Sequence, residues 1–203
     1  MVDNESRIIR LDLEGRWTCS DFGLIYTHFE DIYNLRLVLE AFLEQQHNSN
    51  PVFDHRMLPS RLESDLIRIV VDLLPNDRAN VRRIQYASPG LTDIAGVGVI
   101  VGHIKEFLIR AIEFGAPSER LRRQLENIKR GMEIEELETK RQADRLQNAK
   151  AMIDIAERLS YSESEITKLV SWVDERQETF IRLAAQGKLR GVRLLDEEGS
   201  KTE

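Results

Sequence analysis

The feature of this sequence that most constrains its fold is the composition of residues 118–160. This stretch has no proline and one glycine, Gly131, and it consists mainly of Glu, Arg, Lys, Gln, Leu and Ala, which are strong helix formers. Acidic residues stand four positions before basic ones, as Glu119 does before Arg123, and such pairs stabilise a solvated helix. An unbroken helix of this length would extend about 60 Å, more than the width of a compact domain of this size. We therefore expect the stretch to project, to bend or to pair with another surface.

A second helix is predicted directly after this stretch. Ser162 and Glu165 have the spacing of a capping box, an apolar stripe of helical period follows them, and Gly187 is a natural helix end. A helical hairpin with its turn at residues 160–162 would bury the two apolar stripes against each other. The residues after Leu195 are mostly acidic and polar, and we expect them to form a disordered tail.

The N-terminal half mixes the periods of strands and helices. Strands show apolar residues at every second position, and helices show them at every third or fourth. Between two of the predicted strands, Ser88-Pro89-Gly90 has the residues of a type II turn, which would fold the second strand back on the first. The predicted strands are residues 7–14, 81–87 and 91–95, and the predicted helices are residues 21–46 and 97–114. In the 81–87 strand, regular alternation places Val81 and Ile84 on opposite faces.

Residues 60–74 fit two structures. Ser60-Arg61-Leu62-Glu63 has the form of a capping box, which favours a helix. The residues that follow are rich in Ile and Val and also alternate, which favours a strand. We prefer the helix because the cap is a specific local signal, and Pro75 would end either element.

These patterns predict an α+β fold, in which a small antiparallel sheet covered by helices is followed by a long α-helical hairpin or coiled-coil-like C-terminal half. The corresponding organisation is an α+β domain at residues 1–116, a helical segment at residues 117–195 and a tail at residues 196–203.

Composition points to a soluble cytoplasmic protein. No apolar run reaches the length of a membrane span, and the N-terminal residues lack the pattern of an export signal. The lone cysteine, Cys19, can form no disulfide within the chain, and we expect it to be a buried thiol. The net charge of −6 argues against broad binding to nucleic acid or anionic membranes.

Motifs for catalysis, cofactors or metals are absent from the sequence. Gly96, Gly98 and Gly102 lack the spacing of a dinucleotide-binding loop, and we expect Gly98 and Gly102 to allow close helix packing instead. The four histidines form no closely spaced ligand pair, and no serine lies in a nucleophile motif. We therefore expect no cofactor and no metal, and a non-enzymatic role is favoured.

The predicted interface is an apolar stripe on the long helix. Its residues keep spacings of three and four on either side of a polar gap, which is typical of coiled coils but too short to prove one. We therefore expect a non-catalytic interaction or assembly protein that binds itself or a protein partner through its C-terminal helices. The interface residues are Leu121, Leu125, Ile128, Met132, Leu146 and Ile153.

Two other functions stay open. A ligand or nucleotide sensor or enzyme could have a pocket beside the Ser88-Pro89-Gly90 turn, because turns often carry function. Nucleic acid could bind the basic face between Arg120 and Arg130, although the acidic block at residues 133–138 would repel a phosphate backbone.

Overall fold

The computed structural model describes residues 6–45, 55–60, 62–85, 89–115, 150 and 152–195 of the chain. It shows a mixed α+β fold, as predicted. A further helical segment spans 152–158. The other elements, in chain order, are β1 (Ser6–Leu13), α1 (Cys19–Gln45), the 3-10 helix η1 (His55–Ser60), α2 (Leu62–Leu73), β2 (Asn80–Gln85), β3 (Gly90–Val97), α3 (Gly98–Gly115), α6 (Glu163–Ala185) and β4 (Leu189–Leu195).

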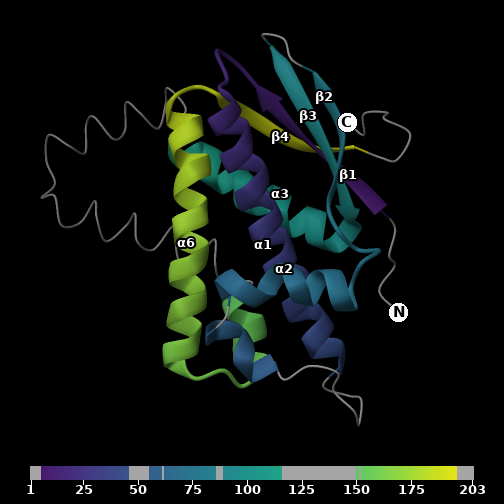
Figure 1. Cartoon of the computed structure of the whole chain (residues 1–203). Coiled ribbons are helices and arrows are strands. Elements are labelled where there is room, and N and C mark those ends of the chain that lie inside the picture. The colour runs from purple at the N-terminus through teal and green to yellow at the C-terminus, as the bar shows by residue number, and fades with distance from the viewer. Residues whose placement is uncertain are drawn as a thin grey trace, which may run out of the picture.

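The four strands form one antiparallel sheet in the order β2-β3-β1-β4 (Figure 1). The predicted pairing of β2 with β3 is confirmed. The fourth strand is a correction, because Leu189–Leu195 falls in the segment predicted to be helical and instead pairs with β1. The chain thus returns to the sheet after α6.

Alternation along β1 divides the sheet into two faces. Ile9, Leu11 and Leu13 are buried, whereas Arg10 and Asp12 point to the other side and are partly exposed. Helix α3 packs on β1, β3 and β4, and α1 lies beside it. We call the side of Ile9, Leu11 and Leu13 the helix-covered face and the other side the open face.

Helix α2 is confirmed for the residues that also fitted a strand. Leu62, Leu66, Ile69 and Val70 are buried at spacings of three and four, which only a helix places on one side. The proposed capping box is not tested, because residue 61 lies outside the described residues.

The end of the predicted long helix belongs to the core. Residues 152–158 are helical, and Met152, Ile155 and Ala156 are buried among the core side chains. Ser160 then adopts a positive φ of 61°, and α6 begins with the predicted cap, in which the Ser162 N–H donates to the Glu165 carboxylate at 2.7 Å.

Helix α6 runs alongside α1 and packs on α3 (Figure 1). The rings of Phe107 and Phe180 meet edge to face at 6.2 Å between centroids. The long hairpin or coiled coil is not confirmed, because residues 116–149 lie outside the described residues.

Tyr33 links α1 to the turn before β2 and to the end of β3. Its hydroxyl donates to the Asp77 carbonyl at 2.7 Å and accepts from the Val97 N–H at 2.8 Å. Burial raises the pKa of Tyr33 to about 12. A Cβ atom at Gly96 would lie 2.7 Å from the Tyr33 ring, so the close approach requires glycine there. The packing role predicted for Gly102 is wrong, because a Cβ atom there would meet nothing within 4 Å.

Two remaining observations concern the surface. Cys19 is exposed at the first position of α1, so the expectation of a buried thiol is wrong. The helices in the described ranges include none with the length and apolar character needed to cross a membrane.

Candidate partner-binding surface

Strand β2 is an edge strand whose side chains are all exposed. Val81 and Ile84 are 48% and 52% exposed. Their partners across the ladder in β3, Ile94 and Thr92, are 2% and 0% exposed. The helices therefore cover β3 but leave its neighbour β2 open to solvent.

A β-bulge determines where the side chains of β2 point. Val81 pairs with Ile94 and Arg83 pairs with Asp93, so Arg82 is an extra residue between them. Val81 and Ile84 consequently both lie on the helix-covered face, since their partners in β3 do. The predicted placement of these two residues on opposite faces is wrong, because regular alternation does not survive the bulge.

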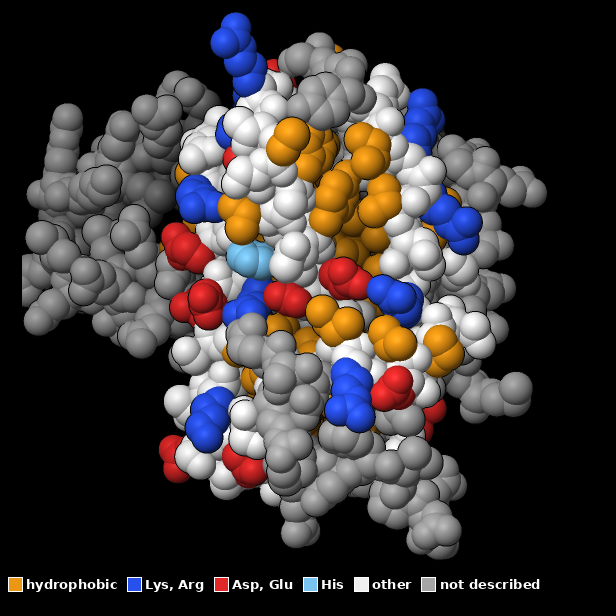
Figure 2. All heavy atoms as spheres, viewed as in Figure 1, with side chains coloured by type: hydrophobic (Ala, Val, Ile, Leu, Met, Phe, Trp, Pro, Cys, Tyr) orange, Lys and Arg blue, Asp and Glu red, His pale blue; other side chains and the backbone are white. Residues whose placement is uncertain are grey.

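A row of aromatic side chains borders β2 on the helix-covered face. The rings of Trp17 and Phe22 are 4.9 Å apart between centroids, and those of Phe22 and Tyr26 are 6.0 Å apart. The Tyr26 hydroxyl lies 2.9 Å from Thr92 Oγ1, which also donates to the Arg83 carbonyl at 3.2 Å. Burial raises the pKa of the Tyr26 hydroxyl. Figure 2 shows hydrophobic side chains gathered between α1 and the β2–β3 hairpin.

Helix α2 adds a second group of exposed apolar side chains. Ile67 and Val71 are 53% and 44% exposed, and Figure 2 shows hydrophobic side chains over α2 with charged ones between the two groups. Glu30 and Arg78 form an exposed ion pair at 3.5 Å. We call Ile67, Val71, Val81, Ile84, Arg82 and Arg83 the β2–α2 surface.

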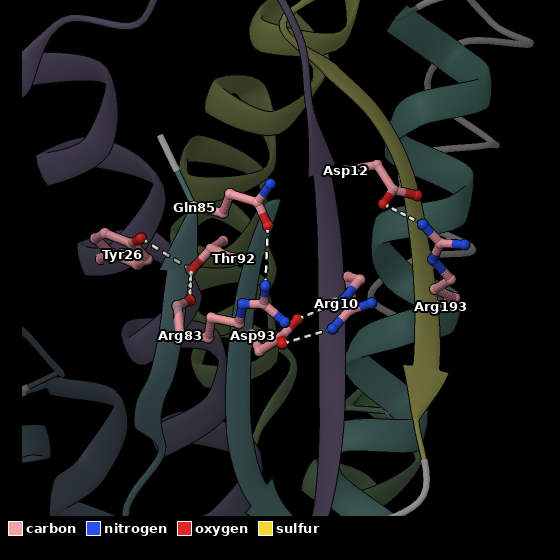
Figure 3. A network of polar contacts seen from close by, with 8 residues as sticks. All are labelled: Arg10, Asp12, Tyr26, Arg83, Gln85, Thr92, Asp93 and Arg193. Carbon is pink, nitrogen blue, oxygen red and sulfur yellow. Dashed lines mark hydrogen bonds and ion pairs between the residues drawn. The ribbon is translucent and has the colours of Figure 1, made fainter. Parts of the chain in front are cut away.

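The open face carries a row of charged side chains (Figure 3). Arg10 makes two hydrogen bonds to the Asp93 carboxylate, at 2.7 and 2.8 Å. These bonds to Asp93 raise the pKa of Arg10. Arg193 donates to Asp12 at 2.6 Å. Arg83 differs, because it donates to the neutral amide oxygen of Gln85 at 3.1 Å.

A further polar cluster joins α1 to α6. Arg176 donates to Asp31 at 3.1 Å and lies 3.9 Å from the centroid of the Trp172 ring. Burial, helped by the charge of Arg176, lowers the pKa of His28. The guanidinium contacts both the Asp31 carboxylate and the Trp172 ring, so this cluster holds the helices together. The described ranges also contain no group of three or more His, Cys, Asp or Glu residues able to hold a metal.

The interface predicted on the long helix lies almost entirely outside the described residues. Ile153 is described; it is partly buried and packs against the core. Five predicted interface residues lie outside the described residues, namely Leu121, Leu125, Ile128, Met132 and Leu146.

The turn proposed for a ligand falls between β2 and β3. Ser88 lies outside the described residues, Pro89 is exposed, and Gly90 is buried as the first residue of β3, opposite Leu13. The basic face between Arg120 and Arg130 lies outside the described residues as well.

No protein-family model matches the sequence, and neither curated proteins nor solved structures provide a similar chain. The function must therefore be argued from the β2–α2 surface and the residues around it.

Proposed function

We propose that this chain is a non-catalytic interaction or assembly protein that binds a protein partner through its β2–α2 surface. One observation carries the proposal. Among the described residues, large hydrophobic side chains are exposed at five positions, and four of these lie on α2 and β2. Isolated exposed apolar residues are ordinary, but a group of them beside an uncovered sheet edge is typical of interaction sites.

Energetics favour this function. Covering an aliphatic side chain of this size from full exposure yields about 1.5 to 3 kcal/mol, so half-exposed Val81 and Ile84 retain a large part of that gain for a partner. The aromatic row beside them is held in place, since the Phe22 and Tyr26 rings stack and the Tyr26 hydroxyl bonds to Thr92. A partner would therefore meet a preformed surface and lose little free energy to its ordering.

The C-terminal stripe of Leu121, Leu125, Ile128, Met132 and Leu146 remains part of the proposal as a second route, by which the chain would bind a copy of itself. This route predicts that the mass measured by light scattering rises with protein concentration. Val81 and Ile84 should have no influence on that rise.

Photo-crosslinking in living cells tests the β2–α2 surface. A photoreactive phenylalanine is placed at position 84 or 67, and matched controls carry it at the exposed positions 168 on α6 and 190 on β4. We expect one adduct of defined mass from positions 84 and 67, absent from the controls. Equal adducts at all four positions, or none at 84 and 67, would contradict the proposal.

A further inference from the structure

The outer side of β2 has no ladder partner among the residues that the structure describes. In the portion of the chain that the structure describes, β2 forms its ladder with β3 alone. Its other side therefore directs N–H and C=O groups away from the sheet, and an extended peptide can hydrogen-bond to such an edge as an added strand.

The side chains of β2 specify the pattern that an added strand must have. Val81 and Ile84 line the helix-covered side of this edge, and Arg83 lies on the open side. Side chains of an added strand alternate between the same two sides. Those on the helix-covered side would contact Val81 and Ile84 and should be apolar, whereas those on the open side would lie beside Arg83.

The charges of β2 specify what the open-side residues are. Arg10 and Arg193 on this face each donate to an aspartate. Arg83 lies across the ladder from the same Asp93 that Arg10 holds, and among the described residues it donates to the amide oxygen of Gln85. A Glu or Asp on an added strand would give Arg83 a carboxylate acceptor that it does not share with Arg10. Arginine binds carboxylates in this way with strong geometric preference.

A second copy of the chain fits this edge poorly. Symmetric antiparallel pairing of two β2 strands about their centre would set Arg82 against the Arg83 of the other copy, and like charges placed opposite each other destabilise a ladder. The bulge and the two arginines thus discourage pairing between copies. The same positive charges attract a strand of opposite charge.

We propose that the partner contributes an extended segment of alternating apolar and acidic residues, which pairs with β2 as a fifth strand. This inference rests on the proposed function, because it names the kind of partner that the β2–α2 surface binds. Backbone hydrogen bonds would supply affinity, and the carboxylates beside Arg82 and Arg83 would supply selectivity.

Synthetic peptides test the pairing with the full-length protein. The probe is a fluorescent eight-residue peptide of alternating Val and Glu, and its controls are a Val–Lys peptide and a peptide with the same Val and Glu residues arranged in two blocks. We expect the Val–Glu peptide to bind at least tenfold more tightly than either control, as measured by fluorescence anisotropy. Comparable binding of the block peptide would overturn the proposal, since attraction without strand pairing would then suffice.

Charge reversal provides the matched protein variants. The double variant R82E/R83E should lose at least tenfold in affinity for the Val–Glu peptide and should bind the Val–Lys peptide instead. The double variant K168E/R190E changes the net charge equally at exposed positions away from β2 and should bind like the unmodified protein. Equal losses in both variants would overturn the proposal.

The crosslinking experiment separates failure of this inference from failure of the proposed function. An adduct at position 84 that survives R82E/R83E would mean that a partner binds the surface without an acidic strand. An adduct of twice the mass of the chain would mean that the occupant is a second copy. Both results overturn the inference and leave the proposed function intact, whereas absence of the adduct overturns both.

Discussion

The two edge strands of the sheet, β2 and β4, differ in how far the rest of the chain covers their side chains and pairs their charges. On β4, Leu189 and Leu195 are buried, and the arginines of the strand pair with carboxylates, Arg190 with Glu14 and Arg193 with Asp12. On β2, every side chain is exposed. The carboxylate across the ladder from Arg83, that of Asp93, is held by Arg10, and Arg83 donates to the amide oxygen of Gln85.

Connectivity explains the difference between the edges. Strand β4 follows α6, which packs on α1 and α3, and α3 packs on β4 in turn. Strand β2 is joined to β3 by a short connection, and the helices that cover β3 stop short of it. An edge reached through the helical layer is thus covered by that layer, and the hairpin edge is left exposed.

The largest expected effect is the loss of stability on truncation of a buried leucine in β4. Leu189→Ala should lower the free energy of unfolding by about 2 to 5 kcal/mol, because it leaves a cavity at a fully buried position. Ile84→Ala should lower it by less than about 1 kcal/mol, because solvent already reaches the side chain. Urea unfolding followed by tryptophan fluorescence measures both. Similar losses would mean that β2 is part of the core and not an open edge.

The sequence predicted the elements whose own apolar periods are regular. The periods of β1 and α1 are long and regular, and both elements lie within two residues of their predicted bounds. The helix α2 is preferred over a strand because of the capping-box pattern before it, and its buried residues at spacings of three and four confirm the helix. In these segments, burial of one side suffices to fix the structure.

Strand β4 could not be predicted in the same way. Its sequence interrupts alternation at Gly191, and its register with β1 shifts between Asp12 and Leu13. Without a regular period of its own, the segment is identified as a strand by its pairing with β1 in the tertiary fold. From the sequence, the helix ends at Gly187 and no strand is predicted for the residues after it, which stay within the helical segment 117–195.

The candidate surface was missed for a related reason. Exposure of Val81 and Ile84 depends on the bulge at Arg82 and on the absence of a covering helix over β2 in the described part of the chain. The spacing of apolar residues along the chain encodes neither of these two features. The signal available in the sequence was the apolar pair Val81 and Ile84, three residues apart around two arginines. Regular alternation assigns Val81 and Ile84 to opposite faces.

Low pH should lower the stability of the β4 edge, because it protonates the Asp21 carboxylate. The Asp21 carboxylate accepts from Lys188, the residue before β4, at 2.7 Å, and it also accepts from the Thr18 N–H at 2.9 Å. These bonds lower the pKa of Asp21 from 3.8 to about 2. The contribution to stability is therefore complete above about pH 5 and is lost as the pH falls through 4 toward 2.

Asp21→Asn should lower stability at pH 7 by about 1 to 2 kcal/mol, a figure reduced from the full shift because water reaches the pair. The variant and the unmodified protein should converge near pH 2. Asp72→Asn is the control, since the Asp72 pair with Arg68 is 3.5 Å long and mostly exposed. Urea unfolding at pH 7, 4 and 2.5 gives the comparison. A constant difference between the Asp21→Asn variant and the unmodified protein at all three pH values would contradict this assignment.

The smallest expected effect concerns the turn that leads into α6. Ser160 has a positive φ, and the Tyr161 N–H donates to the Ala156 carbonyl at 3.0 Å, as in a helix end that normally contains glycine. Ser160→Gly should therefore raise the free energy of unfolding by about 0.5 to 1 kcal/mol, whereas Ser164→Gly, within the first turn of α6, should lower it by a similar amount.

Hydrogen exchange compares the two edges. Because β4 is held by α6 and α3, its amides should exchange hydrogen about two- to fivefold more slowly in Ser160→Gly. The amides of β2 on its free side open locally and should exchange at an unchanged rate. If both edges slowed together, β2 would unfold only with the whole molecule, and the contrast between a covered and an open edge would not hold in solution.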